Sequence, residues 1–461
     1  MAINFPDDFL ERISGQDYLD AGSLLGALDG PAPVSIRINP MKWSGKPVES
    51  TPVPWCSSGH YLQSRPSFTS DPLFHAGCYY VQEASSMFLE TVAREAGIEG
   101  HGLRILDICA APGGKTTHLA SLAGKGSAII ANEVIRPRAS VLAENIVKWG
   151  TGNVMVTGSD PSAFRKLTGY FDIILVDAPC SGEGMFREEG ARSQWSVGNC
   201  SLNAGRQRRI LSDVWPSLKE GGWLIYSTCT FNPAENEDQI VRLLEEKRCS
   251  LLKPEIGRFP GITPVSISGG LAGWGFHPGR VRGEGFFISA IRKEEPQQPV
   301  KTGAKPARSR GSISGKMAGR AIEYAIVPDN YIDDFGGTAI ALPLPVTEFR
   351  MLAENLRIVK AGTALYTQKR DNIVPCHELS MSVNFRREVL PVVEVGYKEA
   401  AAFLRRNDLQ AIRPAGRGWS TVVYRGVPLG FIRDLGSRVN NYYPSEWRIR
   451  KASFEGEPGI I

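Results

Sequence analysis

The sequence lacks the patterns that mark a membrane or exported protein. No apolar run approaches the roughly 20 residues that a membrane-spanning helix needs. Near the N-terminus, Asp7 and Asp8 stand where a signal peptide has basic and then apolar residues. We therefore expect a cytoplasmic protein with no membrane partner.

Paired cysteines are also missing. None of the eight cysteines forms a C-x-x-C pair, which argues against a zinc ribbon, a thioredoxin-type site and a disulfide framework. We expect reduced thiols and no metal site. The cysteines are Cys56, Cys78, Cys109, Cys180, Cys200, Cys229, Cys249 and Cys376.

Composition is ordinary for a globular protein. Of 461 residues, 42% are hydrophobic and 22% charged, so a disordered chain and a coiled-coil rod are both disfavoured. At roughly 150 residues per domain, this length predicts two to four domains. The formal net charge of +5 permits an anionic partner without requiring one.

Strand and helix patterns alternate through the middle of the chain. This alternation predicts the α/β class, with a mostly parallel sheet and helices on both faces. The predicted strands are 104–108, 127–132, 154–157, 171–176 and 223–227, and the predicted helices are 116–123, 137–149, 206–219 and 235–247.

The flanking segments predict smaller units. A helix at 7–13 and a strand at 34–39 suit a small N-terminal α/β domain, and the segment after residue 292 becomes rich in Pro, Gly, Ser and basic residues, which is typical of a linker. Short strands and turns then predict small α+β and β units. The predicted boundaries are 1–98, 99–292, 293–320 for the basic linker, 321–385 and 386–461.

A glycine-rich segment follows the first predicted strand of the sheet. In DICAAPGGKTT (residues 107–117), Gly113 and Gly114 allow the backbone to approach a ligand closely. Glu133 ends the next strand, at a spacing that suits hydrogen bonds to ribose hydroxyls. A nucleoside-containing cofactor is therefore predicted. The spacings of a phosphate loop and of G-x-G-x-x-G are absent, and a simple connecting turn is the remaining alternative.

Two cysteines follow two further strands. Cys180 lies in DAPCSGEG (residues 177–184) and Cys229 in YSTCTFNPAEN (residues 226–236), so both are predicted at the carboxyl edge of the sheet, beside the glycine-rich loop. A lone cysteine is more often a small buried hydrophobe. Two thiols and a carboxylate at one edge weaken that alternative.

These groups suit methylation of a pyrimidine ring. Carbon 5 becomes nucleophilic when a thiolate adds to carbon 6, a hydrogen-bond donor such as Asp177 near ring nitrogen 3 favours the adduct, and a base must later remove the carbon 5 proton. The chemistry alone leaves open which thiol attacks, because DNA cytosine-5 methyltransferases use the cysteine of a Pro-Cys pair.

Longer motifs resemble the Nop/Sun family of S-adenosylmethionine-dependent RNA 5-methylcytosine methyltransferases, and most closely its bacterial RsmF-like ribosomal RNA branch. CAAPGGK (109–115), DAPCSGEGMFR (177–187) and STCTFNPAENE (227–237) resemble the family's cofactor loop, fourth motif and sixth motif. QEASSM (82–87) and SIRINPMK (35–42) resemble its entry segment and N-terminal RNA-side motif.

The resemblance extends over nearly the whole chain. GEGFF (283–287) is similar to the last catalytic-domain strand, and NLRIVKAG (355–362), PCHELSMS (375–382), GVPLG (426–430) and NYYP (441–444) are similar to the branch's C-terminal extension. The resemblance implies a Rossmann-like class I methyltransferase sheet and, at the end of the chain, a PUA-like RNA-binding fold.

Site roles follow from the resemblance. It implies that Cys229 is the nucleophile, that Cys180 helps to release the product and that Asp177 lies near the cytosine; Lys115 is a further substrate-side contact. Asp160 departs from the family pattern because proline, not glycine, follows it. The implied cofactor-binding residues are Cys109, Ala110, Ala111, Pro112, Gly113, Gly114, Lys115, Glu133, Asp160 and Asp177.

The sequence therefore predicts an enzyme that transfers a methyl group from S-adenosylmethionine to carbon 5 of cytosine in ribosomal RNA, through a covalent cysteine–cytosine adduct. The RNA partner is expected to be 16S rRNA or a small-subunit assembly intermediate, and the protein a monomer. The alternatives are a catalytically silent RNA-binding ribosome-assembly factor and a methyltransferase acting on an exocyclic amine, which needs no thiol.

Overall fold

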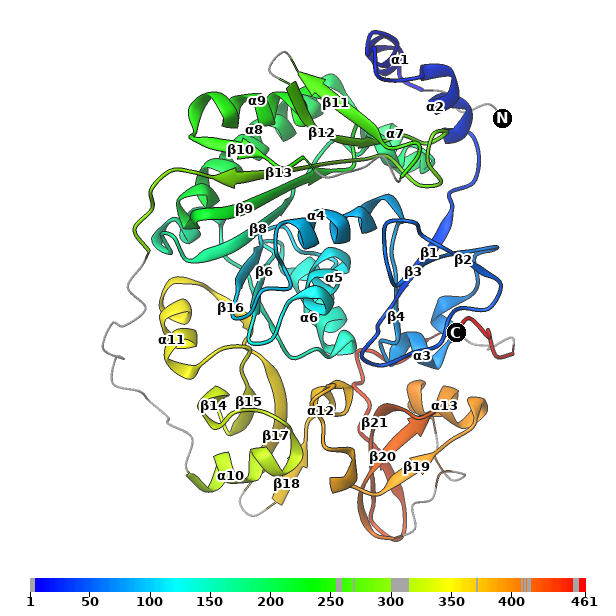
Figure 1. The fold of residues 1–461 in the computed structure, drawn as a ribbon. Coiled ribbons are helices and arrows are strands. Elements are labelled where there is room, and N and C mark those ends of the chain that lie inside the picture. The colour runs from blue at the N-terminus through cyan, green and yellow to red at the C-terminus, as the bar shows by residue number, and fades with distance from the viewer. Residues whose placement is uncertain are drawn as a thin grey trace.

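The computed structural model describes residues 5–253, 259–267, 270–299, 315–369, 372–407, 409, 412, 416–450 and 456–461 (Figure 1). Within these residues, the strands form four sheets, and the largest of them occupies the middle of the molecule. Most of the predicted linker, residues 300–314, lies outside the described part of the chain.

The central sheet has the strand order β11-β12-β13-β9-β8-β5-β6-β7-β16, and β10 also pairs with β13. β5 to β9 run parallel, whereas the remaining strands are antiparallel to their neighbours. The strands are β5 (Arg104–Asp107), β6 (Ala128–Asn132), β7 (Val154–Thr157), β8 (Phe171–Asp177), β9 (Leu218–Thr228), β10 (Cys249–Leu251), β11 (Thr263–Ile267), β12 (Gly270–Phe276), β13 (Phe286–Lys293) and β16 (Ile358–Lys360).

Both faces of this sheet are buried. Ile105 packs with Leu119 and Leu142 on one face, while its neighbour Leu106 packs with Leu211 on the other, because successive strand residues point to opposite sides. The first face is covered by α4 (Leu89–Glu95), α5 (Gly114–Leu122) and α6 (Arg136–Trp149), and the second by α8 (Val197–Val214), α9 (Glu237–Glu246) and α11 (Val346–Asn355). The predicted α/β class and Rossmann-like arrangement are confirmed. The prediction of a mostly parallel sheet is wrong: the sheet is mixed, because β10 to β13 and β16 add antiparallel pairs to both edges of the parallel strands β5 to β9.

One predicted helix, 206–219, has the wrong bounds. α8 begins at Val197, where the Ser196 hydroxyl accepts a hydrogen bond from the Asn199 amide, and it ends at Val214. Pro216 follows in a short 3-10 turn, and β9 starts at Leu218 rather than at the predicted residue 223. The first half of α8 has too few regularly spaced apolar residues for the helix to be recognised there from the sequence.

The N-terminal segment divides into two parts. β1 (Val34–Ile38), β2 (Ser50–Pro52), β3 (Gly59–Leu62) and β4 (Tyr79–Val81) form an antiparallel sheet of order β2-β3-β1-β4, with α3 (Pro72–His75) beside it. The helices α1 (Asp7–Ser14) and α2 (Ala21–Leu28) lie apart from that sheet (Figure 1) and pack on Phe186 and Phe231. The short α7 (Glu189–Gln194) lies nearby.

Two small sheets occupy the C-terminal part. One has the order β14-β15-β17-β18 and the other β19-β20-β21-β22. Their elements are β14 (Ile332–Phe335), β15 (Thr338–Ala341), β17 (Thr363–Lys369), β18 (Asn372–Pro375), β19 (Val392–Glu394), β20 (Gly418–Tyr424), β21 (Val427–Asp434) and β22 (Val439–Asn441), with α10 (Gly315–Tyr324), α12 (His377–Met381) and α13 (Tyr397–Leu404).

Segments far apart in the sequence pack together at two places. Ile36 and Tyr79 of the N-terminal sheet share a core with Phe403 and Ile432, so the two ends of the chain meet. β16, which lies inside the predicted 321–385 unit, pairs with β7 and extends the central sheet. The C-terminal part is therefore joined to the rest of the molecule by an apolar core and by a strand pair.

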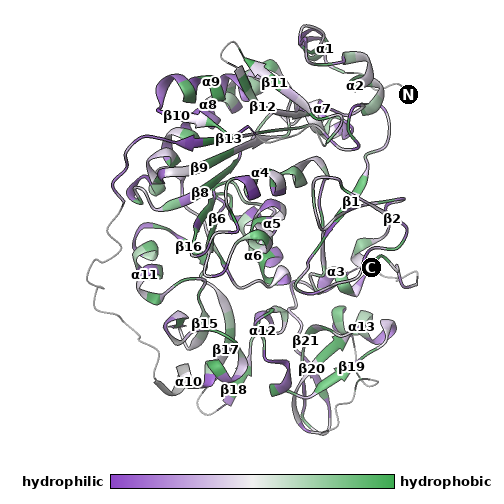
Figure 2. Cartoon of the chain, viewed as in Figure 1, coloured by the Kyte–Doolittle hydropathy of each residue, from purple (hydrophilic) through white to green (hydrophobic). Residues whose placement is uncertain are grey.

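Figure 2 shows hydrophobic residues concentrated on the strands of the central sheet and on the inner faces of its helices. None of the helices in the described part of the chain has the length and apolar character to cross a membrane.

Candidate active site

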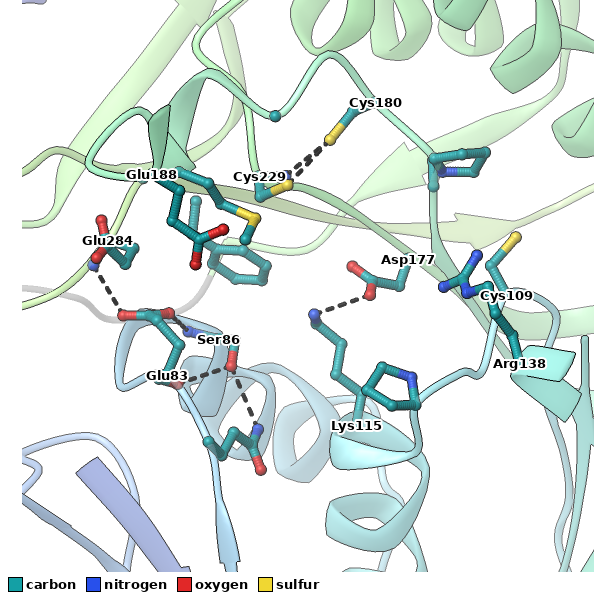
Figure 3. Close-up of a pocket in the computed structure, with 18 of the residues that line it drawn as sticks. Glu83, Ser86, Cys109, Lys115, Arg138, Asp177, Cys180, Glu188, Cys229 and Glu284 are labelled. Carbon is teal, nitrogen blue, oxygen red and sulfur yellow. Dashed lines mark hydrogen bonds and ion pairs between the residues drawn. The ribbon is translucent and has the colours of Figure 1, made fainter. Parts of the chain in front are cut away.

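A cavity of about 1510 Å³ opens at the carboxyl edge of the parallel strands (Figure 3). An edge where parallel strands end is the usual ligand site of an open α/β sheet. Eight of the predicted site residues line this cavity: Cys109, Pro112, Lys115, Glu133, Asp160, Asp177, Cys180 and Cys229. Ala110, Ala111, Gly113 and Gly114 belong to the same loop but do not line the cavity.

The glycine-rich loop connects β5 to α5 and is held in place by α6. The Arg138 guanidinium donates a hydrogen bond to the Ala111 carbonyl at 2.8 Å, and the Asn145 amide donates to the Pro112 carbonyl at 2.8 Å. Gly113 has φ +112°, and a β-carbon there would lie 3.2 Å from a Leu142 methyl group. The loop's shape therefore depends on the close packing of α6.

Glu133 follows β6 directly and is buried, with 4% of its surface exposed. Its carboxylate accepts a hydrogen bond from the Ile135 amide at 2.9 Å and pairs with Arg138 at 3.3 Å. These contacts hold the carboxylate at the cavity wall, where its oxygens can accept hydrogen bonds from diol hydroxyls.

Asp160 lies at the cavity rim and is more than half exposed. Its side chain accepts hydrogen bonds from Ser162 and pairs with Arg209 at 3.0 Å. The hydrogen bonds from Ser162 are the main reason that the pKa of Asp160 is lowered. This carboxylate therefore already caps the short 3-10 helix that begins at Pro161.

The two thiols meet inside the cavity. The Cys180 and Cys229 sulfur atoms lie 3.1 Å apart, and the Cys229 amide donates a hydrogen bond to the Cys180 sulfur at 3.3 Å (Figure 3). The hydrogen bond with the Cys229 thiol and burial raise the pKa of Cys180 well above its ordinary value. Cys180 is therefore held as the neutral thiol near neutral pH.

Asp177 ends β8 between the thiols and the glycine-rich loop. It accepts hydrogen bonds from Lys115 at 2.9 Å and from the Ser227 hydroxyl at 2.8 Å. Burial lowers the pKa of Lys115, but the nearby Asp177 carboxylate raises it by more, so the net pKa is above its ordinary value. Lys115 therefore remains protonated and faces the thiols from the opposite side of the cavity (Figure 3).

A buried polar network positions the Cys180 loop. The Glu235 carboxylate accepts hydrogen bonds from the Ser181 amide at 2.9 Å and from the Gln207 side chain at 3.1 Å. Gln207 also donates to the Pro179 carbonyl at 3.0 Å. Glu235 and Gln207 thus brace the residues on both sides of Cys180.

Sequence reasoning missed the supporting residues of the site. Glu235 belongs to the motif STCTFNPAENE (227–237), and Arg138 lies soon after Glu133 in the sequence. Both positions could therefore have been recognised as supporting residues. Gln207 gave no such signal in the sequence, because only the packing of α8 brings it to the Cys180 loop.

Cationic side chains also line the cavity and suit phosphate contacts; they are Arg65, Arg138, Arg187, Arg206 and Arg209.

Three family models match the chain. The model for the 16S rRNA methyltransferase RsmB/F matches residues 99–292. The model for the N-terminal domain of 16S rRNA methyltransferase RsmF matches residues 5–84, and that for the methyltransferase RsmF PUA domain matches residues 390–449. The C-terminal match bears out the PUA-like prediction.

Curated relatives match over almost their entire length. The chain is 30% identical over 471 aligned positions to a ribosomal RNA small subunit methyltransferase F from Enterobacter sp., covering 96% of each chain. It is 31% identical to the protein of the same name from Salmonella paratyphi A, covering 96% of this chain and 97% of the relative.

Solved structures share the fold. A methyltransferase homolog protein from Pyrococcus horikoshii has a TM-score of 0.53 and 30% identity, covering 63% of this chain and 96% of that one. NSun6 from Pyrococcus horikoshii with SFG has a TM-score of 0.51 and 22% identity, covering 63% and 99%. The second likeness supports the fold alone.

Proposed function

Because the chain belongs to the family of ribosomal RNA small subunit methyltransferase F, we propose that it methylates carbon 5 of a cytosine in small-subunit rRNA through a covalent cysteine adduct. Membership makes the chain an rRNA methyltransferase. The finer assignment to carbon 5 is carried by one observation: two thiols 3.1 Å apart open into one cavity with the glycine-rich loop.

The residues of the cavity wall fit a nucleoside-containing methyl donor. Cys109, Pro112 and Glu133 line the side of the cavity formed by β5, β6 and α6, and Glu133 offers a buried carboxylate that can accept hydrogen bonds from ribose hydroxyls. We assign these residues to S-adenosylmethionine, which supplies, when bound, a methyl group carried on a positively charged sulfur. Asp160 is the weaker assignment, because its carboxylate already caps a helix and pairs with Arg209.

The thiols then have separate tasks. The Cys229 thiolate forms a bond to carbon 6 of cytosine, and the electron pair of the C5=C6 bond moves to carbon 5, which becomes nucleophilic. After carbon 5 has been methylated, its proton leaves to a base, the C5=C6 bond re-forms and the Cys229 sulfur departs as thiolate. Cys180, held neutral beside it, is the poorer nucleophile and is assigned to product release.

Asp177 and Lys115 complete the substrate side. Their ion pair lies in the same cavity as the thiols, so an incoming base meets both a carboxylate and a protonated amine. We assign the Asp177 carboxylate to accept a hydrogen bond from the exocyclic amine of cytosine; only its protonated form can donate to ring nitrogen 3, which favours the adduct. Lys115 holds the Asp177 carboxylate in position.

The test uses 16S rRNA labelled with tritium at carbon 5 of cytosine, together with unlabelled S-adenosylmethionine. Methylation at carbon 5 releases the tritium to water, whereas methylation of the exocyclic amine leaves it in the RNA. We expect one tritium released for each methyl group transferred. Methyl transfer without tritium release would contradict the carbon 5 assignment.

The catalytically silent assembly factor remains the second candidate. It predicts tight RNA binding with no methyl transfer to naked rRNA, to the assembling subunit or to the finished subunit. The intact pair of thiols and the intact glycine-rich loop favour the enzyme. All three RNA substrates are therefore tested in one experiment. Methyl transfer to any one of them excludes the silent factor, whereas binding without transfer to all three favours it.

A further inference from the structure

A second cluster of chemically reactive side chains lies away from the catalytic cavity. Cys56, Glu90 and His118 are all buried, and one ligand atom from each lies within 4.8 Å of the other two. Among the residues that the structure describes, this is the only group of three or more such side chains so placed. None of the three lines the catalytic cavity.

We propose that Cys56, Glu90 and His118 bind a divalent transition-metal ion, with Zn²⁺ as the best match. The His118 Nε2 atom lies 3.1 Å from a Glu90 carboxylate oxygen and 3.7 Å from the Cys56 sulfur. A tetrahedral zinc ion with ordinary bond lengths holds nitrogen and oxygen ligands about 3.3 Å apart and nitrogen and sulfur ligands about 3.6 Å apart. The cluster therefore has the spacing of a zinc site.

The donor set also suits zinc. A thiolate, an imidazole and a carboxylate are its three usual protein ligands, whereas Mg²⁺ and Ca²⁺ prefer oxygen ligands alone. The Ser58 hydroxyl lies 3.9 Å from the Cys56 sulfur, and Ser58 is partly exposed. A fourth ligand, either this hydroxyl or a water molecule, can approach from that side.

The surroundings orient the Glu90 carboxylate. The Ser57 amide donates hydrogen bonds to both Glu90 oxygens, at 3.2 and 3.3 Å, and Arg94 pairs with the same carboxylate at 3.2 Å. The His118 Nδ1 atom is buried and has no hydrogen-bond partner among the described residues. No second contact fixes the ring's tautomer, so Nε2 can offer its lone pair to a cation.

The simpler alternative is a hydrogen-bonded triad without metal. Neutral His118 donates from Nε2 to Glu90 in that case, and the Cys56 thiol packs beside them as a small hydrophobe. Both arrangements join the same three segments: the loop between β2 and β3, α4 and α5. The two arrangements differ in whether the position of the loop between β2 and β3 depends on a metal ion.

The role of the ion would be structural. It would tie the N-terminal sheet to two helices that cover the central sheet, one of which, α5, begins at the glycine-rich loop. Metal binding then stabilises the folded state by mass action, and removing the metal lowers the melting temperature without any change in the thiol chemistry.

The experiment measures metal directly in the full-length protein. Protein stripped with chelator under reducing conditions is titrated with Zn²⁺ and Co²⁺. We expect one ion bound per chain, a cobalt spectrum with a sulfur-to-metal charge-transfer band, and a rise in melting temperature on adding Zn²⁺. The His118→Gln and Cys56→Ser variants should bind at least tenfold more weakly.

Two controls separate this cluster from the other thiols. Cys78→Ser removes a buried thiol that belongs to no such cluster and should bind the ion like the wild type. The double variant Cys180→Ser/Cys229→Ser removes the catalytic thiols, which can also take soft metals. The charge-transfer band should persist in that variant.

Three results would overturn the proposal: no stoichiometric binding by the wild-type protein, full binding by His118→Gln, or loss of the cobalt band in the catalytic double variant. If a cluster variant fails to fold, the cobalt spectra of the wild type and of the catalytic double variant still decide the question.

Discussion

At the residue scale, the two thiols of the cavity differ in what surrounds them. Cys180 accepts a hydrogen bond from the Cys229 amide and lies in a loop braced by Glu235, and its pKa is raised. This arrangement favours attack by Cys229, even though the Pro-Cys pair at Cys180 resembles the nucleophile of DNA enzymes. The two cysteines should therefore fail in different ways when substituted.

Cys180→Ala should allow the adduct to form but not to resolve, so it should trap RNA in a complex that resists heat and detergent. Cys229→Ala should abolish both methylation and the trapped complex, because no bond to carbon 6 can form. Denaturing gels with labelled rRNA measure both outcomes. The double variant is the control and should show no complex; trapping by Cys229→Ala alone would exchange the two roles.

Glu133→Ala should weaken S-adenosylmethionine binding by roughly 1.5–3 kcal/mol, the usual value of a charge-assisted hydrogen bond. Calorimetric titration measures this change, and Glu133→Gln, which keeps the side-chain shape, should be intermediate. Asp160→Ala is the matched carboxylate control at the same cavity and should have the smaller effect. Equal affinity in Glu133→Ala would remove the ribose assignment.

At the scale of elements, the site depends on where α6 begins and ends. Its first turn holds the glycine-rich loop through Arg138, and Gly150, which follows its last residue and has φ +78°, lies against the C-terminal part of the chain. The Val383 amide donates a hydrogen bond to the Gly150 carbonyl at 2.9 Å. One helix therefore joins the glycine-rich loop to the C-terminal segment.

Gly150→Ala should destabilise the protein more than Gly97→Ala. Both glycines have positive φ, which costs an alanine about 1–2 kcal/mol. A β-carbon at Gly150 would also lie 2.1 Å from the Met381 carbonyl oxygen, whereas nothing lies within 4 Å at Gly97. Denaturant unfolding should show an additional loss of roughly 1–3 kcal/mol for Gly150→Ala, as overpacking usually costs. Equal losses would mean that this contact yields easily.

At the scale of the whole molecule, buried histidines link stability to pH. Burial lowers the pKa of His75 and of His277 to about 4, whereas an unfolded histidine titrates near 6.5. Their contribution to stability is therefore present above about pH 6.5 and is lost as pH falls toward 4. Burial raises the pKa of Asp107 to about 7, which acts in the opposite direction.

A comparison of variants isolates the histidine contribution. Between pH 6.5 and 4, the melting temperature of His277→Gln should fall less steeply than that of the wild-type protein. His101→Gln, at an exposed position, should keep the wild-type slope. Thermal unfolding monitored by circular dichroism measures all three, and identical slopes for His277→Gln and wild type would contradict the prediction.

RNA binding also belongs to this scale. The sequence predicts that the C-terminal units contact RNA through Arg405, Arg406, Arg413, Arg417 and Arg425, together with Trp419 and Tyr424; the alternative is a core aromatic or two beneath a solvated basic surface. Tyr424 is 4% exposed and packs in a core, so for this residue the stacking prediction is wrong. Arg413 lies outside the described residues, Arg425 pairs with Glu457, and Arg406 donates to the Tyr443 carbonyl. Arg417 is exposed, as is Arg438. Deleting everything after residue 292 is a poor test, because it would also remove β16 from the central sheet.

The substitution Arg417→Glu tests RNA contact by the C-terminal units and leaves the central sheet intact. It should weaken rRNA binding about tenfold and reduce the slope of log affinity against log salt by about one, if Arg417 contacts a phosphate. Lys125→Glu makes the same change of charge at an exposed loop between α5 and β6 and should have a smaller effect. Filter binding over a range of salt concentrations measures both, and an unchanged slope in Arg417→Glu would exclude that contact.

Local sequence patterns were sufficient to predict the class of the fold and the edge of the sheet where the candidate site residues meet. Short apolar runs such as 104–108 and 171–176 are typical of strands buried inside a parallel sheet. The motifs that follow such strands meet at the carboxyl edge of the sheet. Those local patterns were enough to predict that the loop, Asp177, Cys180 and Cys229 would come together.

Features that depend on contacts between distant segments become visible only in the folded molecule. The pairing of β16 with β7, the shared core of the two chain ends, the support of Cys180 by Gln207, and the meeting of Cys56, Glu90 and His118 leave no periodic signal along the chain. Each joins residues whose local sequence allows many partners, and the choice among them is made when the whole core packs and excludes the alternatives.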